Sequence, residues 1–396
     1  MKRSLYCGVF AFGQWYLFLL ISVAFVRTAQ ARDNHMPNIK NDYLLVINTY
    51  TSDAPWSNAI IEPVQKWVST ERNVAVFVEH LNMLMIDNAA EFGELENSLF
   101  GKYAHKAPKG VLLLGNSTLL LKDKLRDYWG DIPIILCAEE NYFGPDTAYI
   151  NKSPIPKEER VPISALADDY NLTSLQTKMF PRNNVDLLRQ VIPGLKEILL
   201  IGDGRYVNKQ LNYDMERLMA QKYPGLKYRF LSAANMSLEE LMSLLETIDV
   251  TSTGVLFSSW FEKTNIAGNS ILSANSFRVI ANLSVPVFAL KSAVMNNSGM
   301  VGGYFYDEQA FLAHLQQTIL SVLADTPPRK IPFYVPTEAK PTFSYPSMLL
   351  KGFSVEDFPQ NSVFIDRPQT FFEQHKFSII LGASLIAVLL IAVFAY

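Results

Sequence analysis

The chain has 396 residues, of which 49% are hydrophobic and 18% charged, and its formal net charge is −3. This length is sufficient for two domains with separate hydrophobic cores. The small negative charge provides no basic field, so nucleic acid is not expected as a partner. The hydrophobic content is at the upper edge of the globular range, and two long apolar segments account for much of the excess.

Two uncharged segments of about twenty residues predict membrane helices, because a helix of that length spans about 30 Å. They are Leu5–Val26 and Phe377–Tyr396. Residues 1–31 are interpreted either as a signal peptide, since the small residues Ala29 and Ala31 suit cleavage, or as a first transmembrane helix. Both interpretations place the residues between the two segments outside the cytoplasmic membrane.

Between the membrane segments, apolar runs typical of buried strands alternate with helical patterns. The predicted strands of a first group are Tyr43–Tyr50, Val74–Leu81, Gly110–Ser117 and Ile132–Glu140. After a proline-rich stretch the predicted strands are Glu197–Asp203, Lys227–Ala233, Thr253–Trp260 and Pro286–Lys291. Continuous apolar strands separated by helices indicate parallel sheets covered on both faces. The predicted fold class is therefore α/β, with two doubly wound parallel-sheet lobes flanked by membrane helices.

The predicted helices of the two groups are Trp56–Ser69, Ala89–His105, Leu119–Trp129, Asn208–Lys222, Leu238–Ile248 and Ile271–Leu283. Ser237 and Glu240 have the spacing of a capping box at the start of one of them. A further helix is predicted over Glu308–Leu323, and the proline-broken stretch Asp325–Pro346 predicts an edge strand or a surface crossing.

These elements give predicted domain boundaries. Lobe 1 spans residues 42–165 and is completed by residues 300–353, whereas lobe 2 spans residues 166–299. A juxtamembrane linker, residues 354–376, leads to the transmembrane helix of residues 377–396. Capping-box spacing in the linker, between Thr370 and Glu373, predicts a helix that starts at Phe371 and continues into the membrane.

Parallel α/β sheets bind ligands beyond the carboxyl ends of their strands. In this sequence the predicted strand ends carry hydroxyls, amides and aromatic rings, a mixture that suits a small polar ligand. The candidate ligand-binding residues are Tyr50, Ser52, Asp53, Trp56, Asn116, Ser117, Asn141, Tyr142, Asp203, Trp260 and Lys291. Asn116 and Ser117 lie at a predicted helix N-terminus, where backbone N–H groups favour an anionic or carbonyl group. Each candidate also has a purely structural interpretation: Ser117 can cap a helix, and Asp203 can close a turn.

No enzyme motif is present in the sequence: it contains no phosphate-binding loop, nucleophile elbow or dinucleotide fingerprint. Its five histidines and two cysteines are scattered without metal-ligand spacing, so neither a metal nor another cofactor is expected. Glu139 and Glu140 are neighbours on a predicted strand and therefore point to opposite faces, which argues against a shared catalytic proton. We expect no catalytic residue in this chain.

Several segments resemble the ABC-transporter substrate-binding-protein-like family, which has a type I periplasmic binding protein fold. They are Asn48–Val64, Gly115–Phe143, Ile192–Gln210 and Gly302–Asp325. The later segment Phe358–Ile391 is similar to the region that joins such a domain to the second membrane helix of bacterial sensor histidine kinases. One departure is Gly115-Asn116-Ser117, where related sequences often carry acidic residues after the third strand.

The resemblance implies the extracytoplasmic input module of a two-component sensor histidine kinase. Such a module binds a small polar ligand, or a periplasmic binding protein, and signals through its C-terminal transmembrane helix. The resemblance further implies a homodimer in the bacterial inner membrane, with the main domain in the periplasm. The kinase part is not in this sequence, so the chain itself is not expected to be an enzyme.

The alternative is a membrane-anchored substrate-binding protein of an ABC importer. The C-terminal apolar segment favours signalling, and Cys7 lacks the neighbouring small residues that a lipidated cysteine requires. An exported enzyme is disfavoured because no nucleophile is paired with a base. The sequence leaves open the identity of the ligand, cleavage of the N-terminal segment, the oligomeric state and whether the native chain continues into a kinase.

Overall fold

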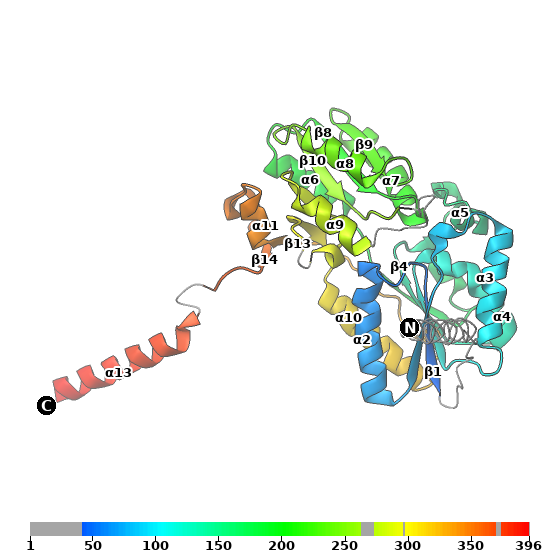
Figure 1. Cartoon of the computed structure of the whole chain (residues 1–396). Coiled ribbons are helices and arrows are strands. Elements are labelled where there is room, and N and C mark those ends of the chain that lie inside the picture. The colour runs from blue at the N-terminus through cyan, green and yellow to red at the C-terminus, as the bar shows by residue number, and fades with distance from the viewer. Residues whose placement is uncertain (1–41, 263–272, 296–297, 370–373, 396) are drawn as a thin grey trace, which may run out of the picture. The chain divides into compact units, whose positions relative to one another are not determined.

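The computed structural model describes residues 42–262, 273–295, 298–369 and 374–395. The predicted N-terminal membrane segment lies outside these residues. Residues 42–395 contain two parallel-sheet lobes, each with helices on both faces of its sheet, followed by a C-terminal apolar helix (Figure 1). The α/β prediction with two lobes is confirmed.

The first sheet has five parallel strands in the order β2-β1-β3-β4-β7. Its strands are β1 (Tyr43–Asn48), β2 (Ala75–His80), β3 (Gly110–Leu114), β4 (Ile134–Ala138) and β7 (Leu172–Gln176). All residues of β1, β3, β4 and β7 are buried, as expected for apolar strands covered on both faces. The edge strand β2 is more exposed.

Two helices cover one face of the first sheet, α2 (Pro55–Arg72) and α10 (Glu308–Leu323). Their apolar residues and those of β1, β3 and β4 form one core cluster, and the Gln316 amide donates a hydrogen bond of 2.7 Å to the Glu71 carboxylate. Pro63 lies inside α2, where it removes one helical hydrogen bond but does not end the helix. The two helices lie in contact although they are far apart in sequence. The Arg72 guanidinium of α2 donates a hydrogen bond to the Leu320 carbonyl of α10, 248 residues further along the chain.

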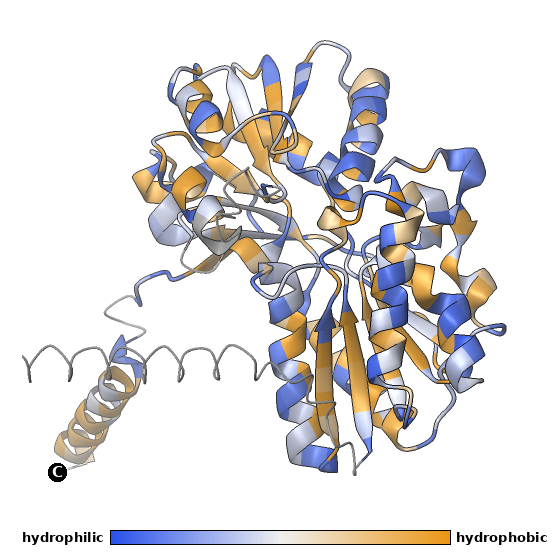
Figure 2. Ribbon diagram, turned by 45° about the vertical axis from the view of Figure 1, so that its right-hand side comes forward, coloured by the Kyte–Doolittle hydropathy of each residue, from blue (hydrophilic) through white to orange (hydrophobic). Residues whose placement is uncertain are grey.

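The second sheet has seven strands in the order β14-β13-β12-β11-β10-β8-β9, and only the β12–β13 pair is antiparallel. Its strands are β8 (Glu197–Gly202), β9 (Lys227–Ser232), β10 (Thr253–Phe257), β11 (Val287–Ala289), β12 (Gly302–Phe305), β13 (Lys340–Ser344) and β14 (Val363–Ile365). Two separate core clusters lie on the two faces of this sheet. Figure 2 shows the corresponding pattern, with apolar residues along the strands and on the inner faces of the helices.

The remaining elements are shorter or connect the strands. The helices are α3 (Ala89–Lys102), α4 (Lys122–Trp129), α5 (Asp146–Ile150), α6 (Pro181–Val191), α7 (Tyr206–Lys222), α8 (Leu238–Glu246), α9 (Ser273–Asn282) and α11 (Tyr345–Leu350). A small antiparallel pair is formed by β5 (Tyr142–Phe143) and β6 (Val161–Pro162). The 3₁₀ turns are η1 (Met83–Met85), η2 (Asn116–Leu121), η3 (Lys157–Glu159), η4 (Ile163–Leu166), η5 (Ser292–Val294), η6 (Pro328–Lys330) and η7 (Val355–Asp357). The capping box of Ser237 and Glu240 is present at the start of α8.

The predicted domain boundaries differ from the structure in three places. Residues 363–365, predicted as part of the juxtamembrane linker, form β14 of the second sheet. Residues 172–176 were assigned to lobe 2, but they form β7 of the first sheet, which the sequence analysis did not predict. Residues 300–353 are predicted to complete lobe 1, but only α10 and residues 328–334 pack there, whereas β12 and β13 pair in the second sheet. The chain therefore crosses between the lobes at residues 177–180, 306–307 and 335–339. Strand β12 escaped prediction because its two glycines break the apolar pattern, whereas β13 lies within the stretch Asp325–Pro346, for which an edge strand or a surface crossing is predicted.

Strand β13 is also not at the edge of its sheet, because β14 pairs with it from Thr342 to Ser344. Pro341 precedes that register, so its missing N–H does not interrupt the β13–β14 ladder. An aromatic group stabilises this addition: the Phe343 ring lies 4.2 Å from Phe358 and 6.0 Å from Phe364, centroid to centroid. Residues 366–375 then separate β14 from the C-terminal helix.

The C-terminal helix α13 (Lys376–Ala395) is the only helix among the described residues that is long and apolar enough to cross a membrane. Its side chains are largely exposed, and in Figure 2 the ribbon of this helix has the hydrophobic colour along most of its length. The predicted helix start at Phe371 lies outside the described residues.

Two glycines provide a matched test of packing in the second sheet. A Cβ atom on Gly303, in β12, would lie 2.2 Å from the Ala289 carbonyl oxygen, whereas a Cβ on Gly101, in α3, would meet no atom within 4 Å. We expect Gly303→Ala to lower the free energy of unfolding by about 1–3 kcal/mol through overpacking. Gly101→Ala should be neutral or stabilising by up to about 1 kcal/mol. Urea unfolding of both variants, followed by circular dichroism, checks this; equal midpoints would contradict the strand pairing.

Candidate functional site

Two cavities are lined by residues of both lobes, and we call them together the interlobe site. The first, about 360 Å³ including its part open to solvent, is lined by Thr49, Tyr50, Met83, Leu84, Asn116, Ser117, Glu139, Tyr149, Lys152, Arg205, Tyr206 and Val207. The second, about 430 Å³ on the same basis, is lined by Tyr50, Ala54, Pro55, Trp56, Arg205, Phe257, Ser258, Ser259, Trp260, Phe277, Lys291, Ala293 and Val294. Most of these residues follow the carboxyl ends of strands, the position expected for ligands of parallel sheets.

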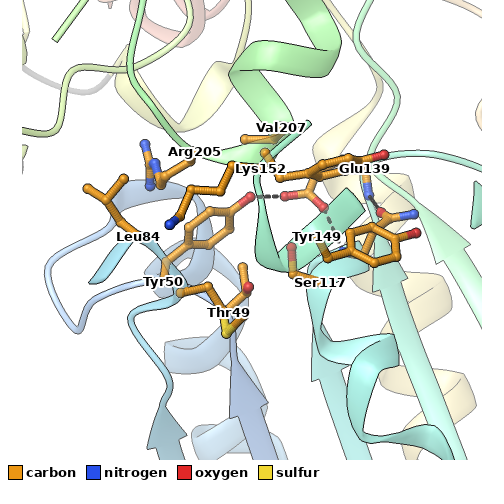
Figure 3. A pocket seen from close by; sticks show the side chains of 12 residues that line it. Thr49, Tyr50, Leu84, Ser117, Glu139, Tyr149, Lys152, Arg205 and Val207 are labelled. Atoms are coloured by element: carbon orange, nitrogen blue, oxygen red, sulfur yellow. Dashed lines mark hydrogen bonds between the residues drawn. The ribbon is translucent and has the colours of Figure 1, made fainter. Parts of the chain in front are cut away.

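Tyr50 and Arg205 line both cavities and connect the lobes. The Arg205 guanidinium, from the second lobe, lies 4.8 Å from the centroid of the Tyr50 ring, from the first lobe. The Tyr50 hydroxyl donates a hydrogen bond to the Glu139 carboxylate (Figure 3). Burial, together with the negative charge of Glu139, raises the pKa of Tyr50 well above its usual value, so the phenol stays a donor.

Glu139, which follows β4, is buried and held by the first turn after β3. Its carboxylate accepts the Asn116 backbone N–H at 3.1 Å, and the Asn116 side-chain oxygen accepts the Glu139 N–H at 2.9 Å. The Asn116 amide also donates to the Tyr142 carbonyl at 2.9 Å. The anion at the N-terminus of η2 is therefore supplied by the chain itself. The Asn116 N–H is thus already used within the protein, whereas the expected ligand contact at Ser117 stays a prediction.

Gly115 makes this turn possible. Its φ is +93°, and a Cβ atom there would lie 2.6 Å from Thr49 Cγ2 and 3.5 Å from a Glu139 carboxylate oxygen. Any other residue would be strained in the backbone and would push Thr49 away. The Gly115-Asn116-Ser117 sequence thus serves to position Glu139 against Tyr50.

Asp203 fixes the position of the Arg205 side chain. It is fully buried and forms two hydrogen bonds with the guanidinium, at 2.9 and 2.6 Å, while Asn208 and Ser259 donate to it at 2.7 and 2.8 Å. Burial opposes ionisation, but the charge and hydrogen bonds of Arg205 outweigh it and lower the pKa of Asp203. Asp203 is therefore a positioning residue for Arg205 and does not itself line either cavity.

The second cavity contains polar groups that have no partner among the described residues. Lys291 makes no hydrogen bond or ion pair there, and its ammonium lies 5.8 Å from the Trp56 ring centroid. Desolvation lowers its pKa. The Ser258 hydroxyl is also unpaired, although the residue is only 1% exposed. In the first cavity the cation is paired, because Lys152 donates to the Ile86 carbonyl at 2.5 Å and to Asp87 at 3.1 Å. The hydroxyls of Thr49, Tyr149 and Tyr206 on that wall are unpaired within the described structure.

Further contacts between charged and polar groups join the two lobes. Arg160, in the β5–β6 connection of the first lobe, donates to Asp214 on α7 of the second lobe at 2.8 Å. The Ile155 N–H likewise donates to Gln210 of α7 at 2.7 Å. Burial, and then the negative charges of Asp214 and Glu139, raise the pKa of Glu140 to about 8.

The structure places six of the eleven predicted site residues around the cavities. Tyr50, Asn116 and Ser117 line the first, and the second is lined by Tyr50, Trp56, Trp260 and Lys291. The other five line neither cavity: Ser52, Asp53, Asn141, Tyr142 and Asp203. Assignment of ligand contacts to the first six stays a prediction.

Those five residues have other positions in the fold. Ser52 and Asp53 lie in the turn before α2, where the Ser52 carbonyl accepts the Asn58 amide at 2.8 Å. Asn141 is exposed. Tyr142 is buried, with the Arg160 guanidinium 4.3 Å from its ring centroid.

Sequence reasoning missed most of the second lobe's contribution and the loops of the first. Arg205, Ser258 and Ser259 follow predicted strands and could have been included on that ground. Leu84 lies in η1, Tyr149 in α5 and Lys152 in the turn after α5, none of which was predicted, so no local signal identified them. Among the described residues, no group of His, Cys, Asp and Glu has the geometry to hold a metal ion.

No family model matches the chain, and none of the curated proteins searched matches it. Solved structures do. The ABC domain in complex with L-Trp from Streptococcus pneumonia has a TM-score of 0.54 at 13% identity, covering 81% of this chain and 99% of that one. A conserved domain protein from Vibrio cholerae has a TM-score of 0.54 at 12% identity, covering 82% and 99%. At these identities the likeness concerns the fold alone, and it confirms the predicted type I periplasmic binding protein-like fold.

The raised pKa of Glu140 predicts a pH dependence of stability. An unfolded glutamate titrates near pH 4.3, whereas Glu140 in the folded protein titrates at about 8, so the folded state binds more protons between these values. Its contribution to stability therefore falls as pH rises from about 4.3 to 8.

Glu140→Gln should remove this fall and raise the melting temperature at pH 8.5, by about 2–4 °C for each kcal/mol regained. Differential scanning fluorimetry at pH 5.5, 7 and 8.5 measures it. Glu158→Gln, in the exposed turn η3, is the control and should melt like wild type throughout. Identical melting of the Glu140 variant and wild type at pH 8.5 would show that Glu140 is not held against Asp214.

Proposed function

We propose that this chain is the extracytoplasmic ligand-sensing module of a membrane-bound sensor histidine kinase. Its ligand is a small polar molecule bound at the interlobe site. The observation that carries the proposal is a pair of cavities lined from both lobes, which hold a cation and buried hydroxyls without protein partners. Such groups are unfavourable in an empty cavity and become favourable when a ligand pairs with them.

The solved structures with this fold support ligand binding as the function. One of them is described as binding L-Trp, and others are described as substrate-binding or solute-binding proteins. A ligand between two lobes stabilises the arrangement in which both lobes contact it, so binding shifts the population toward closure.

The connection to α13 supports signalling. Strand β14 pairs with β13 at the edge of the second sheet, and residues 366–375 lead directly from it to α13. The second lobe is therefore the one attached to the proposed membrane span, and the first lobe moves relative to it. We further propose a homodimer in the bacterial inner membrane with both lobes in the periplasm, so that closure changes the relation of two α13 helices.

Ligand binding is tested by titration of the whole chain in detergent with a panel of amino acids, sugars and organic acids. Trp260 lines the second cavity and is only 1% exposed. Trp260→Ala should weaken binding of any ligand found by at least tenfold, about 1.4 kcal/mol. Trp129→Ala is the control, because Trp129 packs on Phe100 away from both cavities. Calorimetry measures both affinities, and equal losses in the two variants would place the ligand elsewhere.

Closure itself is tested at the Arg160–Asp214 pair, which lines neither cavity. Arg160→Met removes an interlobe contact of about 1 kcal/mol, so the closed state should be less populated and the ligand bound about fivefold more weakly. Arg229→Met, which breaks a pair of the same length to Glu197 within the second lobe, should leave affinity unchanged. Calorimetry separates these outcomes; unaltered affinity in the Arg160 variant would mean that binding does not require closure.

The alternative function, substrate delivery to an ABC importer, is favoured by the same likeness to substrate-binding proteins. Uptake of radiolabelled ligand by cells separates the two. Loss of uptake on deletion of the chain supports the importer, whereas normal uptake with loss of a ligand-induced transcriptional response supports the sensor.

A further inference from the structure

We propose that the second cavity selects an aromatic monocarboxylate without an amino group, whose carboxylate binds Lys291 and Ser258 and whose ring lies among Trp56, Trp260 and Phe277. This inference rests on the proposed function and adds the chemical class of the ligand. It is carried by the distribution of charges and unpaired hydrogen-bonding groups over the cavity wall.

The cationic end of the cavity is available for an anion. Lys291 follows β11, is partly buried, and forms neither a hydrogen bond nor an ion pair within the described ranges. The other cation on the wall, Arg205, is already neutralised by two hydrogen bonds from its guanidinium to Asp203. Lys291 is therefore the position at which an incoming negative charge gains most.

A second unpaired group points to an oxygen acceptor at the same cavity. Ser258 follows β10, the strand next to β11, and its hydroxyl is buried with no partner in the described structure. The Ser258 N–H is already used, because it donates to the Ile201 carbonyl at 3.0 Å. A buried hydroxyl without a partner costs about 1–3 kcal/mol, and a carboxylate oxygen that accepts its proton recovers this loss.

The rest of the wall is aromatic and apolar. Trp56 and Trp260 approach from the two lobes, and Phe257 and Phe277 complete the wall with Ala54, Pro55, Ala293 and Val294. The Trp260 indole N–H is not available to a ligand, because it donates to Glu262 at 3.1 Å. This wall therefore offers ring faces and little hydrogen bonding, which suits a flat apolar body.

A ligand ammonium group would find no counter-charge here. No Asp or Glu is among the residues that line the second cavity, and the undescribed stretches 263–272 and 296–297 contain neither residue type in their sequence. Glu139, on the first cavity, already accepts Tyr50 and the Asn116 N–H. An amino group next to Lys291 would add a second positive charge to a wall that no carboxylate lines, which an acid lacking the amino group avoids.

Titration of Lys291 makes the affinity for a carboxylate depend on pH in a known direction. The charged groups that act on Lys291 are Glu139, Arg205, Asp203 and Glu140, and desolvation is the largest influence on its lowered pKa. A bound carboxylate favours the ammonium form and raises that pKa, so binding takes up a proton when the free Lys291 is partly neutral. Above the pKa of the ligand's own carboxyl group, affinity should therefore fall as the pH rises from the pKa of free Lys291 to its higher pKa in the complex.

The test is calorimetric titration of the whole chain in detergent with four probes that share one ring: indole-3-acetate, L-tryptophan, tryptamine and indole. Indole-3-acetate should bind at least tenfold more tightly than L-tryptophan, and tryptamine should bind no better than indole. Lys291→Met should weaken indole-3-acetate at least tenfold and leave indole unchanged. The control Lys227→Met, at an exposed position of β9, should match wild type.

The melting temperature without ligand shows whether the variant folds. Because no carboxylate on the cavity wall pairs with Lys291, Lys291→Met should melt no lower than wild type. Tighter binding of L-tryptophan than of indole-3-acetate, or an unchanged affinity of Lys291→Met, overturns the proposed ligand class. If a sugar or another amino acid from the broader panel binds and is lost in Trp260→Ala, the sensing function stands and only this inference fails. If no compound binds, both fail.

Discussion

The ion pair between Asp203 and Arg205 is the interaction on which the interlobe site depends. A fully buried carboxylate is unfavourable unless it is paired and hydrogen-bonded, and Asp203 satisfies this condition with Arg205, Asn208 and Ser259. The pair fixes the position of the Arg205 guanidinium, which packs against the Tyr50 ring of the other lobe. Tyr50 is in turn held by Glu139, and Glu139 by the turn at Asn116. One chain of contacts thus runs from β8 to β3 across the lobes.

The two cavities on either side of this chain differ in which of their polar groups are paired. Around the first, the charged groups of Glu139 and Lys152 have partners within the protein, and the unpaired groups are the hydroxyls of Thr49, Tyr149 and Tyr206. Around the second, the Lys291 ammonium and the Ser258 hydroxyl lack partners among the described residues. An unpaired polar group gains free energy when a ligand pairs with it. The second cavity therefore differs from the first by its unpaired cation.

Much of the fold follows from local sequence patterns. Each apolar run of the first group forms a strand, buried in β1, β3 and β4 and partly exposed in the edge strand β2, and α10 has the bounds that its periodicity predicts. The misassigned elements are those in which tertiary context decides. β7 is rich in Thr, Ser and Gln yet fully buried, and β12 begins with two glycines that close contacts with neighbouring strands require. Among the candidate site residues, strand ends located the right edge of each sheet, but they could not show that Asp203 faces Arg205 instead of the cavity.

The packing of α10 on α2 has a consequence for how the protein is made. The core on one face of the first sheet is complete only when α10 is added to α2, about 250 residues later in the chain. Contacts of such long sequence separation form slowly and leave aggregation-prone surface exposed in the meantime. We expect the first lobe to reach its final packing late in folding. Its assembly is coupled to that of the second lobe, whose strands β8 to β12 are synthesised between the two helices.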